Sequence, residues 1–182
     1  PRHRQAGREV GVVEDDRRGL PPELQEQPLE GAGASLHDPA ARRRRTGEGD
    51  DVDPRILDEL LSAGLGDRQV AVLTPYLAQV RRLKGLAKER GVEIGTVDGF
   101  QGREKEGVII SLVRSNDTGE VGFLEDLRRM NVALTRARRL VVVIGDSATV
   151  ARHPVYARLI EHAAAAGGHR SAWEWIGADA TS

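Results

Sequence analysis

Hydrophobic and polar positions follow two different periods along the chain from Asp53 onward. Short continuous apolar runs are typical of strands buried on both faces, whereas apolar residues spaced three and four apart predict helices with one buried side. The apolar runs are Val70–Thr74, Val92–Val97, Gly107–Val113 and Leu140–Gly145. Stretches with the helical spacing lie between them, as expected for parallel strands joined by crossovers. The pattern therefore predicts an α/β fold, a three-layer sandwich with a mostly parallel sheet.

The predicted helices have recognisable ends. Asp53 and Pro54 are typical of an N-cap and a first helical residue, so a helix is expected to begin there. Gly64 follows its apolar residues and is expected to end it. Further helices are expected over residues 75–91, about 124–137 and about 154–166. The apolar side of the first of these three consists of Leu77, Val80, Leu83 and Ala87.

Residues 1–50 differ in composition from the rest of the chain. They contain no Phe, Tyr or Trp and are dense in Arg, Glu, Gly and Pro, so disorder is the first expectation. Val10–Val13 is the only strand-like fragment, and it is too short and isolated to count as an element. The abrupt change near residue 51 favours a second interpretation, in which this segment is mistranslated from the wrong frame of a GC-rich gene. The expected domains are thus a disordered or mistranslated segment over 1–50, a folded domain over 51–176 and a tail over 177–182.

The bulk composition narrows the possible partners. The 182 residues include 27 basic and 28 acidic side chains, for a formal net charge of -1, so any contact with nucleic acid must be local. The absence of cysteine excludes disulfides, thiolate metal sites and cysteine nucleophiles. No apolar run approaches the length of a membrane span, and no signal peptide opens the sequence, so we expect a cytoplasmic protein with no membrane partner. Pro1 opens the sequence and Met130 is its only methionine, so either an initiator was removed or the numbering begins inside a longer product.

Polar residues follow the predicted strands. Functional groups of open parallel sheets collect beyond the carboxyl ends of the strands. The segment after Val97 has two glycines and five charged residues, and Val113 is followed by Arg114, Ser115 and Asn116, which suit hydrogen bonds to phosphate. Each segment taken alone is more typical of a solvated loop or surface turn than of a functional site.

The predicted helix over residues 124–137 is rich in arginine. Arg128, Arg129 and Arg136 do not form one solvated stripe, and its faces mix polar and apolar residues. We expect its guanidinium groups near the carboxyl edge of the sheet, where they would suit a polyphosphate in charge and in fork geometry. Structural salt bridges are an equally good explanation of the same residues.

Three long strings resolve these alternatives together. They are TPYLAQ, TVDGFQGREKEGVIISLVRSN and GFLEDLRRMNVALTRARRLVVVIGD, in that order. This order closely resembles motifs IV, V and VI of superfamily 1B DNA and RNA helicases of the nonsense-mediated-decay and immunoglobulin-mu-binding type, in the AAA ATPase family. The resemblance runs from about Asp53 to Trp175, and VDGFQGREKE and NVALTRAR are too long to be chance matches. It implies a RecA-like domain with a P-loop NTPase-type fold, the second such domain of an ATP-dependent helicase.

The resemblance also implies roles for individual residues. Arg136 matches the catalytic arginine finger that reaches the γ-phosphate of ATP, and positioned guanidinium groups stabilise charge on a transferred phosphoryl group. Glu104 matches the acid that contacts the nucleotide ribose, and Gln101 and Gly102 would shape the same ATP-binding loop. The residues that match the single-strand site are Thr96, Asp98, Arg114, Ser115, Asn116, Tyr76 and Gln79. Tyr76 is equally well explained as a core aromatic.

Parts of a complete helicase are missing from this sequence. It contains no GxxxxGK[ST] phosphate loop, no acidic pair for a metal and no QYRMH-type segment before motif IV. ATP with Mg²⁺ would therefore be bound mainly by a first RecA-like domain in cis or in trans, and this chain alone should hydrolyse almost no ATP. No metal site is expected here, and His153, His162 and His169 are assigned to the surface. The alternative is a stand-alone module that binds single-stranded DNA or RNA, or regulates, without catalysis.

Overall fold

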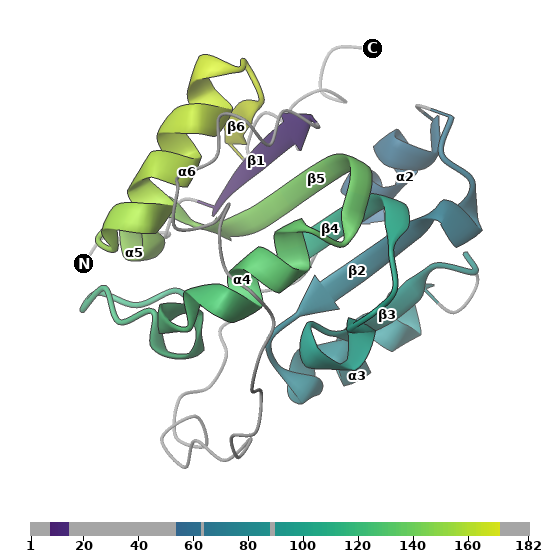
Figure 1. Cartoon of the computed structure of the whole chain (residues 1–182), viewed down its shortest axis with the longest axis horizontal. Coiled ribbons are helices and arrows are strands. Elements are labelled where there is room, and N and C mark those ends of the chain that lie inside the picture. Colours follow the sequence, from purple (N-terminus) through teal and green to yellow (C-terminus); the bar gives the residue numbers. More distant parts are fainter. Residues whose placement is uncertain (1–7, 15–53, 63, 88–89, 172–182) are drawn as a thin grey trace, which may run out of the picture.

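A single sheet organises the fold, and the computed structural model describes it over residues 8–14, 54–62, 64–87 and 90–171. The sheet has six strands in the order β3-β2-β4-β5-β1-β6 (Figure 1). The strands are β1 (Arg8–Glu14), β2 (Val70–Thr74), β3 (Glu93–Thr96), β4 (Lys105–Ser111), β5 (Ala137–Asp146) and β6 (His169–Ser171). The helices are α2 (Pro54–Ser62), α3 (Leu77–Ala87), α4 (Leu127–Leu134), α5 (Ser147–Val150) and α6 (Pro154–Ala165). Three 3₁₀ turns complete the elements: η3 (Asp67–Gln69), η4 (Asp98–Phe100) and η5 (Gly122–Glu125).

Strands β3, β2, β4 and β5 are parallel to one another. All five residues of β2 are buried, because its side chains alternate between two apolar clusters on opposite faces of the sheet. Ala71 and Leu73 pack in one cluster, and Val70 and Val72 pack in the other. A strand buried on both faces has no side that faces solvent, which explains why apolar and polar residues do not alternate in the sequence of β2.

Helices cover both faces of the sheet (Figure 1). One cluster joins the strands to α4, α5 and α6 through residues such as Met130, Val150 and Leu159. The other joins them to α2 and α3 through residues such as Ile56 and Leu83. The predicted α/β, three-layer fold with a mostly parallel, RecA-like sheet is confirmed.

Element boundaries differ from the prediction where charged residues continue a strand. Strand β4 begins at Lys105 and β5 at Ala137, and these two residues are partners in the parallel ladder. Backbone hydrogen bonds therefore extend both strands through polar sequence, and α4 ends at Leu134 instead of near residue 137. Leu77 was predicted on the apolar side of α3 but is 53% exposed, because the first turn of this helix lies beyond the end of β2.

Strand β1 corrects the expectation that Val10–Val13 forms no element. It pairs antiparallel with β5 over its whole length, from Arg8 opposite Asp146 to Glu14 opposite Leu140, and it also pairs with β6. The rest of the predicted 1–50 segment and the 177–182 tail lie outside the described residues. Within the described part of the chain, no helix combines the length and the apolar character that crossing a membrane requires.

Candidate functional site

Most of the predicted site residues lie in two groups at opposite edges of the sheet, and Arg103 and Arg138, which were not predicted, join one of these groups. Because β2 to β5 run parallel, their carboxyl ends share one edge and their amino ends share the other. The carboxyl-edge cluster consists of Tyr76, Thr96, Asp98, Arg114, Ser115 and Asn116, which follow or end β2, β3 and β4. The amino-edge cluster consists of Arg103, Glu104, Arg136 and Arg138, at the starts of β4 and β5. Residues 97–104 connect the two edges, and the exposed Gln101 and Gly102 lie in this connection.

A buried polar pair anchors the loop after β4. Ser115 Oγ donates to Asp146 Oδ2 at 2.8 Å, and the backbone N–H of Asn116 donates to Thr149 Oγ1 at 2.8 Å. Asp146 is 7% exposed and Thr149 is fully buried, and their side chains lie 2.8 Å apart. Sequence reasoning missed both residues. The available signal was an acid directly after a buried strand, where it caps α5 by accepting from the N–H of Ala148.

Asn116 uses its side chain to hold the next turn. Its Oδ1 accepts from Thr118 Oγ1 at 2.8 Å and from the N–H of Glu120 at 3.0 Å, and its Nδ2 donates to the Glu120 carbonyl at 2.8 Å. The amide is therefore part of the loop's own framework. Ser115 and the turn residues Asp117 and Thr118 form the exposed surface of this loop.

The backbone is strained where this loop begins. Val113 has a φ of 65°, a left-handed conformation that a β-branched residue rarely adopts. The turn aims Arg114 at Tyr76, so that Arg114 Nε donates to the tyrosine hydroxyl at 2.8 Å. Gly122 makes room for this side chain, because a Cβ at that position would lie 2.2 Å from an Arg114 terminal nitrogen.

The acid of the carboxyl-edge cluster has a compensating partner. Asp98 Oδ1 lies 3.4 Å from Arg129 Nε, so the arginine partly balances its negative charge. Thr96 shapes the same turn by accepting a hydrogen bond at Oγ1 from the N–H of Gly99 at 3.0 Å. Gln79, by contrast, is only 4% exposed, and this structure does not present its side chain at the surface.

Arg136 lies at the amino edge, so the expectation of a carboxyl-edge position is wrong for this residue. Because α4 ends at Leu134, Arg136 directly precedes β5, and its carbonyl accepts from the N–H of Lys105 at 2.9 Å. Its side chain donates to the Val132 carbonyl at 3.1 Å, the Arg103 carbonyl at 3.3 Å and Thr135 Oγ1 at 3.3 Å. Arg136 is 9% exposed, and among the described residues two of its five N–H groups have no partner.

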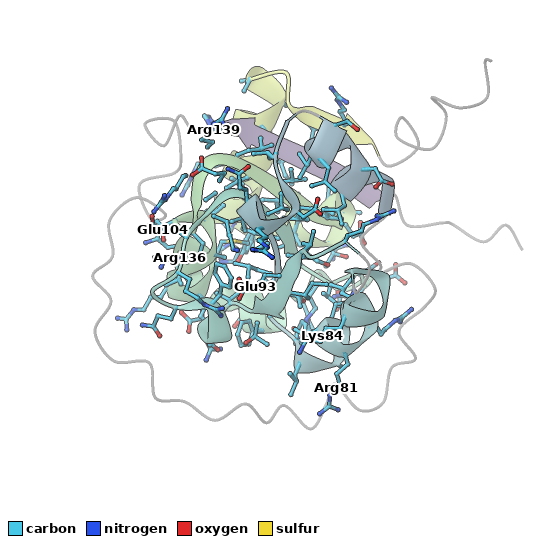
Figure 2. The ribbon with its side chains drawn as sticks, turned by 90° about the vertical axis from the view of Figure 1, so that its right-hand side faces the viewer. Arg81, Lys84, Glu93, Glu104, Arg136 and Arg139 are labelled. Carbon is cyan, nitrogen blue, oxygen red and sulfur yellow. The ribbon has the colours of Figure 1, made fainter. Side chains whose placement is uncertain are left out.

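Glu104 lies beside Arg136 on the same side of the molecule, away from Arg81 and Lys84 of α3 (Figure 2). Its Oε2 accepts from Arg138 Nε at 3.0 Å, and Arg138 also lies 3.7 Å from Glu106. The hydrogen bond that Arg138 donates to Glu104, followed by the negative charge of Glu104, raises the pKa of Arg138 above its ordinary value. Both side chains are about half exposed or more, so this pair adds little stability and Glu104 is accessible at the surface.

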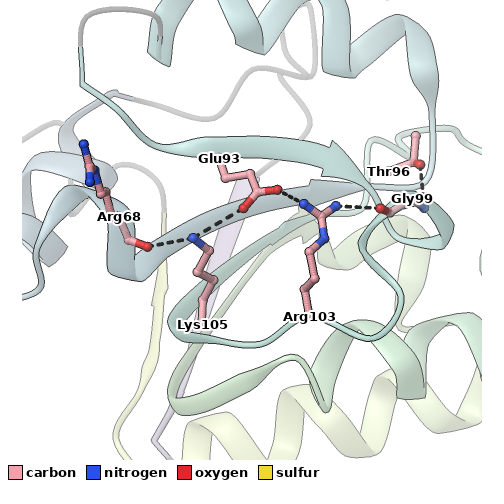
Figure 3. A network of polar contacts seen from close by, with 6 residues as sticks. All are labelled: Arg68, Glu93, Thr96, Gly99, Arg103 and Lys105. Atoms are coloured by element: carbon pink, nitrogen blue, oxygen red, sulfur yellow. Dashed lines mark hydrogen bonds and ion pairs between the residues drawn. The ribbon is translucent and has the colours of Figure 1, made fainter.

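Arg103 links the two ends of the 97–104 connection, and Glu93 of β3 holds Arg103 in place (Figure 3). Glu93 makes two contacts at the end of this connection. Its carboxylate pairs with Arg103 and lies 3.3 Å from Lys105 Nζ. Arg103 also donates to the Gly99 carbonyl at 2.6 Å and stacks on Phe100, with 4.4 Å between the guanidinium carbon and the ring centroid. The connection is therefore fixed to β3 and to its own first turn, and it holds Glu104 in a defined place.

The described residues contain no group of three or more His, Cys, Asp or Glu side chains arranged to hold a metal ion. Of the three histidines assigned to the surface, His153 has a structural role. Its Nδ1 accepts from the N–H of Val155 at 3.3 Å and so caps α6.

One protein family and several known proteins match this chain. The family described as "AAA domain" matches residues 46–148. The chain is 59% identical over 93 residues to the DNA polymerase alpha-associated DNA helicase A of Schizosaccharomyces pombe, covering 50% of this chain and 14% of that protein. It is 48% identical over 122 residues to the DNA-binding protein SMUBP-2 of Mesocricetus auratus, covering 66% of this chain and 12% of that protein. It is 39% identical over 117 residues to the regulator of nonsense transcripts 1 of Caenorhabditis elegans, covering 59% of this chain and 11% of that protein. The chain thus spans only a small part of each of these relatives.

Proposed function

Since this chain belongs to the AAA domain family and is a superfamily 1 helicase-type domain, we propose that it is the C-terminal, second RecA-like half of an ATP-dependent nucleic-acid helicase or translocase. In this proposal ATP binds between this half and a first RecA-like domain, in cis or in trans. A single strand of DNA or RNA binds at the carboxyl-edge cluster. The names of the relatives, a DNA helicase and a DNA-binding protein among them, support this assignment.

One observation carries the proposal: two polar clusters occupy opposite edges of one sheet, and a fixed connection joins them. Residues 97–104 begin next to Thr96 and end next to Arg136, whose side chain donates to the Arg103 carbonyl. A device that couples a nucleotide to a nucleic-acid strand has two separate sites, and a rigid element between them can carry the coupling. A binding module without catalysis needs only the carboxyl-edge cluster.

At the amino edge, Arg136 supplies positive charge for the γ-phosphate and Glu104 supplies acceptors for the ribose hydroxyls. Within the described part of the chain, three N–H groups of Arg136 hold its side chain in place and two have no partner. Such an arrangement suits a group that must be positioned before charge develops. Magnesium would neutralise phosphate charge when ATP is bound. Its ligands belong to the first RecA-like domain in this proposal.

The test is the strand-stimulated ATPase activity of a two-domain enzyme in which this chain follows a first RecA-like domain. Arg136→Ala should lower turnover by roughly 10³- to 10⁵-fold, because a transition-state charge loses its partner. Binding of a single strand should change little, since Arg136 lies at the other edge. Arg139→Ala is the matched control, an exposed arginine of β5 outside both clusters, and should keep the wild-type rate.

The result separates the two candidate functions. Unchanged turnover in Arg136→Ala would remove this residue from the catalytic machinery. If the two-domain enzyme shows no strand-stimulated hydrolysis while the chain still binds single strands, the stand-alone binding module is the better description.

A further inference from the structure

Aromatic rings and guanidinium groups form a column at the carboxyl edge. The Arg114 guanidinium carbon lies 5.4 Å from the Tyr76 ring centroid, and the Tyr76 and Phe123 centroids are 5.9 Å apart with the rings tilted by 53°. The Arg129 guanidinium carbon lies 4.0 Å from the Phe123 centroid. We call Arg114, Tyr76, Phe123 and Arg129 the stacking column. They come from four separate segments, and neither Phe123 nor Arg129 belongs to the predicted site.

The column is not part of the hydrophobic core. The chain has only two tyrosines and two phenylalanines. Phe100 and Tyr156 are at most 1% exposed and belong to a core cluster, whereas Tyr76 and Phe123 are partly exposed and belong to neither cluster. Half of the Phe and Tyr side chains therefore lie at one edge of the sheet, where they contribute less to packing than core rings do.

The charges around the column favour a planar partner over a purely anionic one. Arg129 lies 3.4 Å from Asp98 and 3.5 Å from Asp126, so two carboxylates balance its charge and orient its guanidinium over Phe123. A guanidinium neutralised in this way attracts phosphate weakly but still offers a flat surface. Aromatic rings and guanidinium planes are the groups on which proteins stack unpaired bases.

We propose that the stacking column binds the bases of single-stranded nucleic acid, with Phe123 and Arg129 as stacking residues. The proposal rests on the proposed function, and it adds base stacking to contacts that are otherwise directed at the phosphodiester backbone. Stacking is tolerant of sequence because every base has a π-face. Removing one stacking side chain should weaken binding by roughly 5- to 150-fold for each base that it contacts.

The experiment compares two probes on the intact chain: a fluorescently labelled oligothymidylate and an abasic strand of equal length. The two strands have the same number of phosphates and differ only in their bases. Fluorescence anisotropy at one ionic strength should show at least about 5-fold tighter binding of the oligothymidylate. Phe123→Leu should remove this difference, whereas Phe123→Tyr should retain it because the ring is preserved.

A second variant guards against a loss of folding in Phe123→Leu. Arg129→Lys keeps the charge and removes the plane, so it should reduce the preference for bases without changing the salt dependence of binding. Equal affinity of the wild type for the two strands, or a preference that survives in both Phe123→Leu and Arg129→Lys, would overturn the stacking proposal and leave the proposed function standing. Failure of the wild-type chain to bind either strand would overturn the proposed strand site and the stacking site together.

Discussion

Thr149 is a small residue that determines the position of a large loop. It is fully buried, and its hydroxyl accepts a hydrogen bond from the Asn116 N–H. The same hydroxyl donates to Asp146 Oδ2 at 2.8 Å. Thr149→Val preserves the shape of the side chain but removes the hydroxyl, so the Asn116 N–H and the buried Asp146 carboxylate each lose a hydrogen-bond partner. We expect the free energy of unfolding to fall by about 1–3 kcal/mol, measured by urea denaturation.

Thr118→Val is the control for that substitution. Thr118 lies in the same loop and donates to Asn116 Oδ1, but it is exposed, so water can replace the lost hydrogen bond. Its free energy of unfolding should stay within about 0.5 kcal/mol of the wild type. Equal losses in the two variants would show that burial of Thr149 does not matter.

Tyr156 makes the stability depend on alkaline pH. Burial raises the pKa of its hydroxyl, with the charge of Asp126 adding to the effect, and the hydroxyl donates to the Leu124 carbonyl at 2.5 Å. Because the folded pKa lies above the unfolded value of about 10, its contribution is complete below pH ~10 and is lost as pH rises further. Tyr156→Phe should be less stable than the wild type near neutral pH by about 1 kcal/mol, and this gap should shrink above pH ~10. Urea denaturation at several pH values measures the gap, and a constant gap would contradict the assignment.

At the scale of elements, β1 is the strand whose removal is most informative. It supplies β5 with an antiparallel partner and supplies β6 with its neighbour. Deleting residues 1–14 should lower the free energy of unfolding by at least about 3 kcal/mol, since several ladder hydrogen bonds of about 0.5–1.5 kcal/mol each are lost. The deletion also exposes the edge of β5, so the shortened chain should aggregate more readily.

Deleting residues 1–7 is the matched control, because it leaves β1 intact. Its urea midpoint should equal that of the full chain. If the longer deletion also leaves the midpoint unchanged, β1 contributes nothing to the fold in solution.

The elements that the sequence predicts correctly are those with a local signal. Strand β2 matches its apolar run residue for residue, and α6 begins at Pro154 as expected. Strand β1 has only a short local signal, Val10–Val13, and its stability comes from pairing with β5, a strand far along the chain. The starts of β4 and β5 were also missed, since parallel pairing of Lys105 with Ala137 overrides their polar sequence.

The candidate site shows the same division. The residues after β3 and β4 lie at the carboxyl edge as expected. Arg136 was assigned to the wrong edge because a helix that joins two parallel strands begins at their carboxyl edge and ends at their amino edge. The residues that follow α4 therefore lie at the start of β5. Thr149 and Phe123 were not predicted, since their roles depend on contacts with the loop after β4 and with Tyr76 that no local pattern encodes. Asp146 has a local signal in its position after an apolar run, but its contact with Ser115 has none.

For the whole molecule, the near balance of 27 basic and 28 acidic residues makes any strand binding local. Binding should therefore weaken with salt according to a small number of phosphate contacts, each contributing about -0.7 to the slope of log affinity against log salt. Arg114→Ala, at the carboxyl edge, should make this slope shallower by about 0.7. Arg139→Ala, near the amino end of β5, should leave it unchanged.

Anisotropy titrations of a single strand over a range of salt concentrations measure both slopes. Equal changes of slope in the two variants would indicate that the nucleic acid contacts both edges of the sheet alike. The separation of the two clusters would then have no bearing on where nucleic acid binds.

The place of β1 in the sheet also dictates an order of events during synthesis. Arg8 pairs with Asp146, so a ribosome makes this strand long before it makes the partner. Until β5 has been made, β1 has no β5 to pair with. Strand β6 pairs with β1, so it can be added to the sheet only after β1 has paired with β5. The four parallel strands can assemble first, and the far side of the sheet then closes in the sequence β5, β1, β6. A chaperone or a slow stretch of translation would have its greatest effect on this protein in that interval.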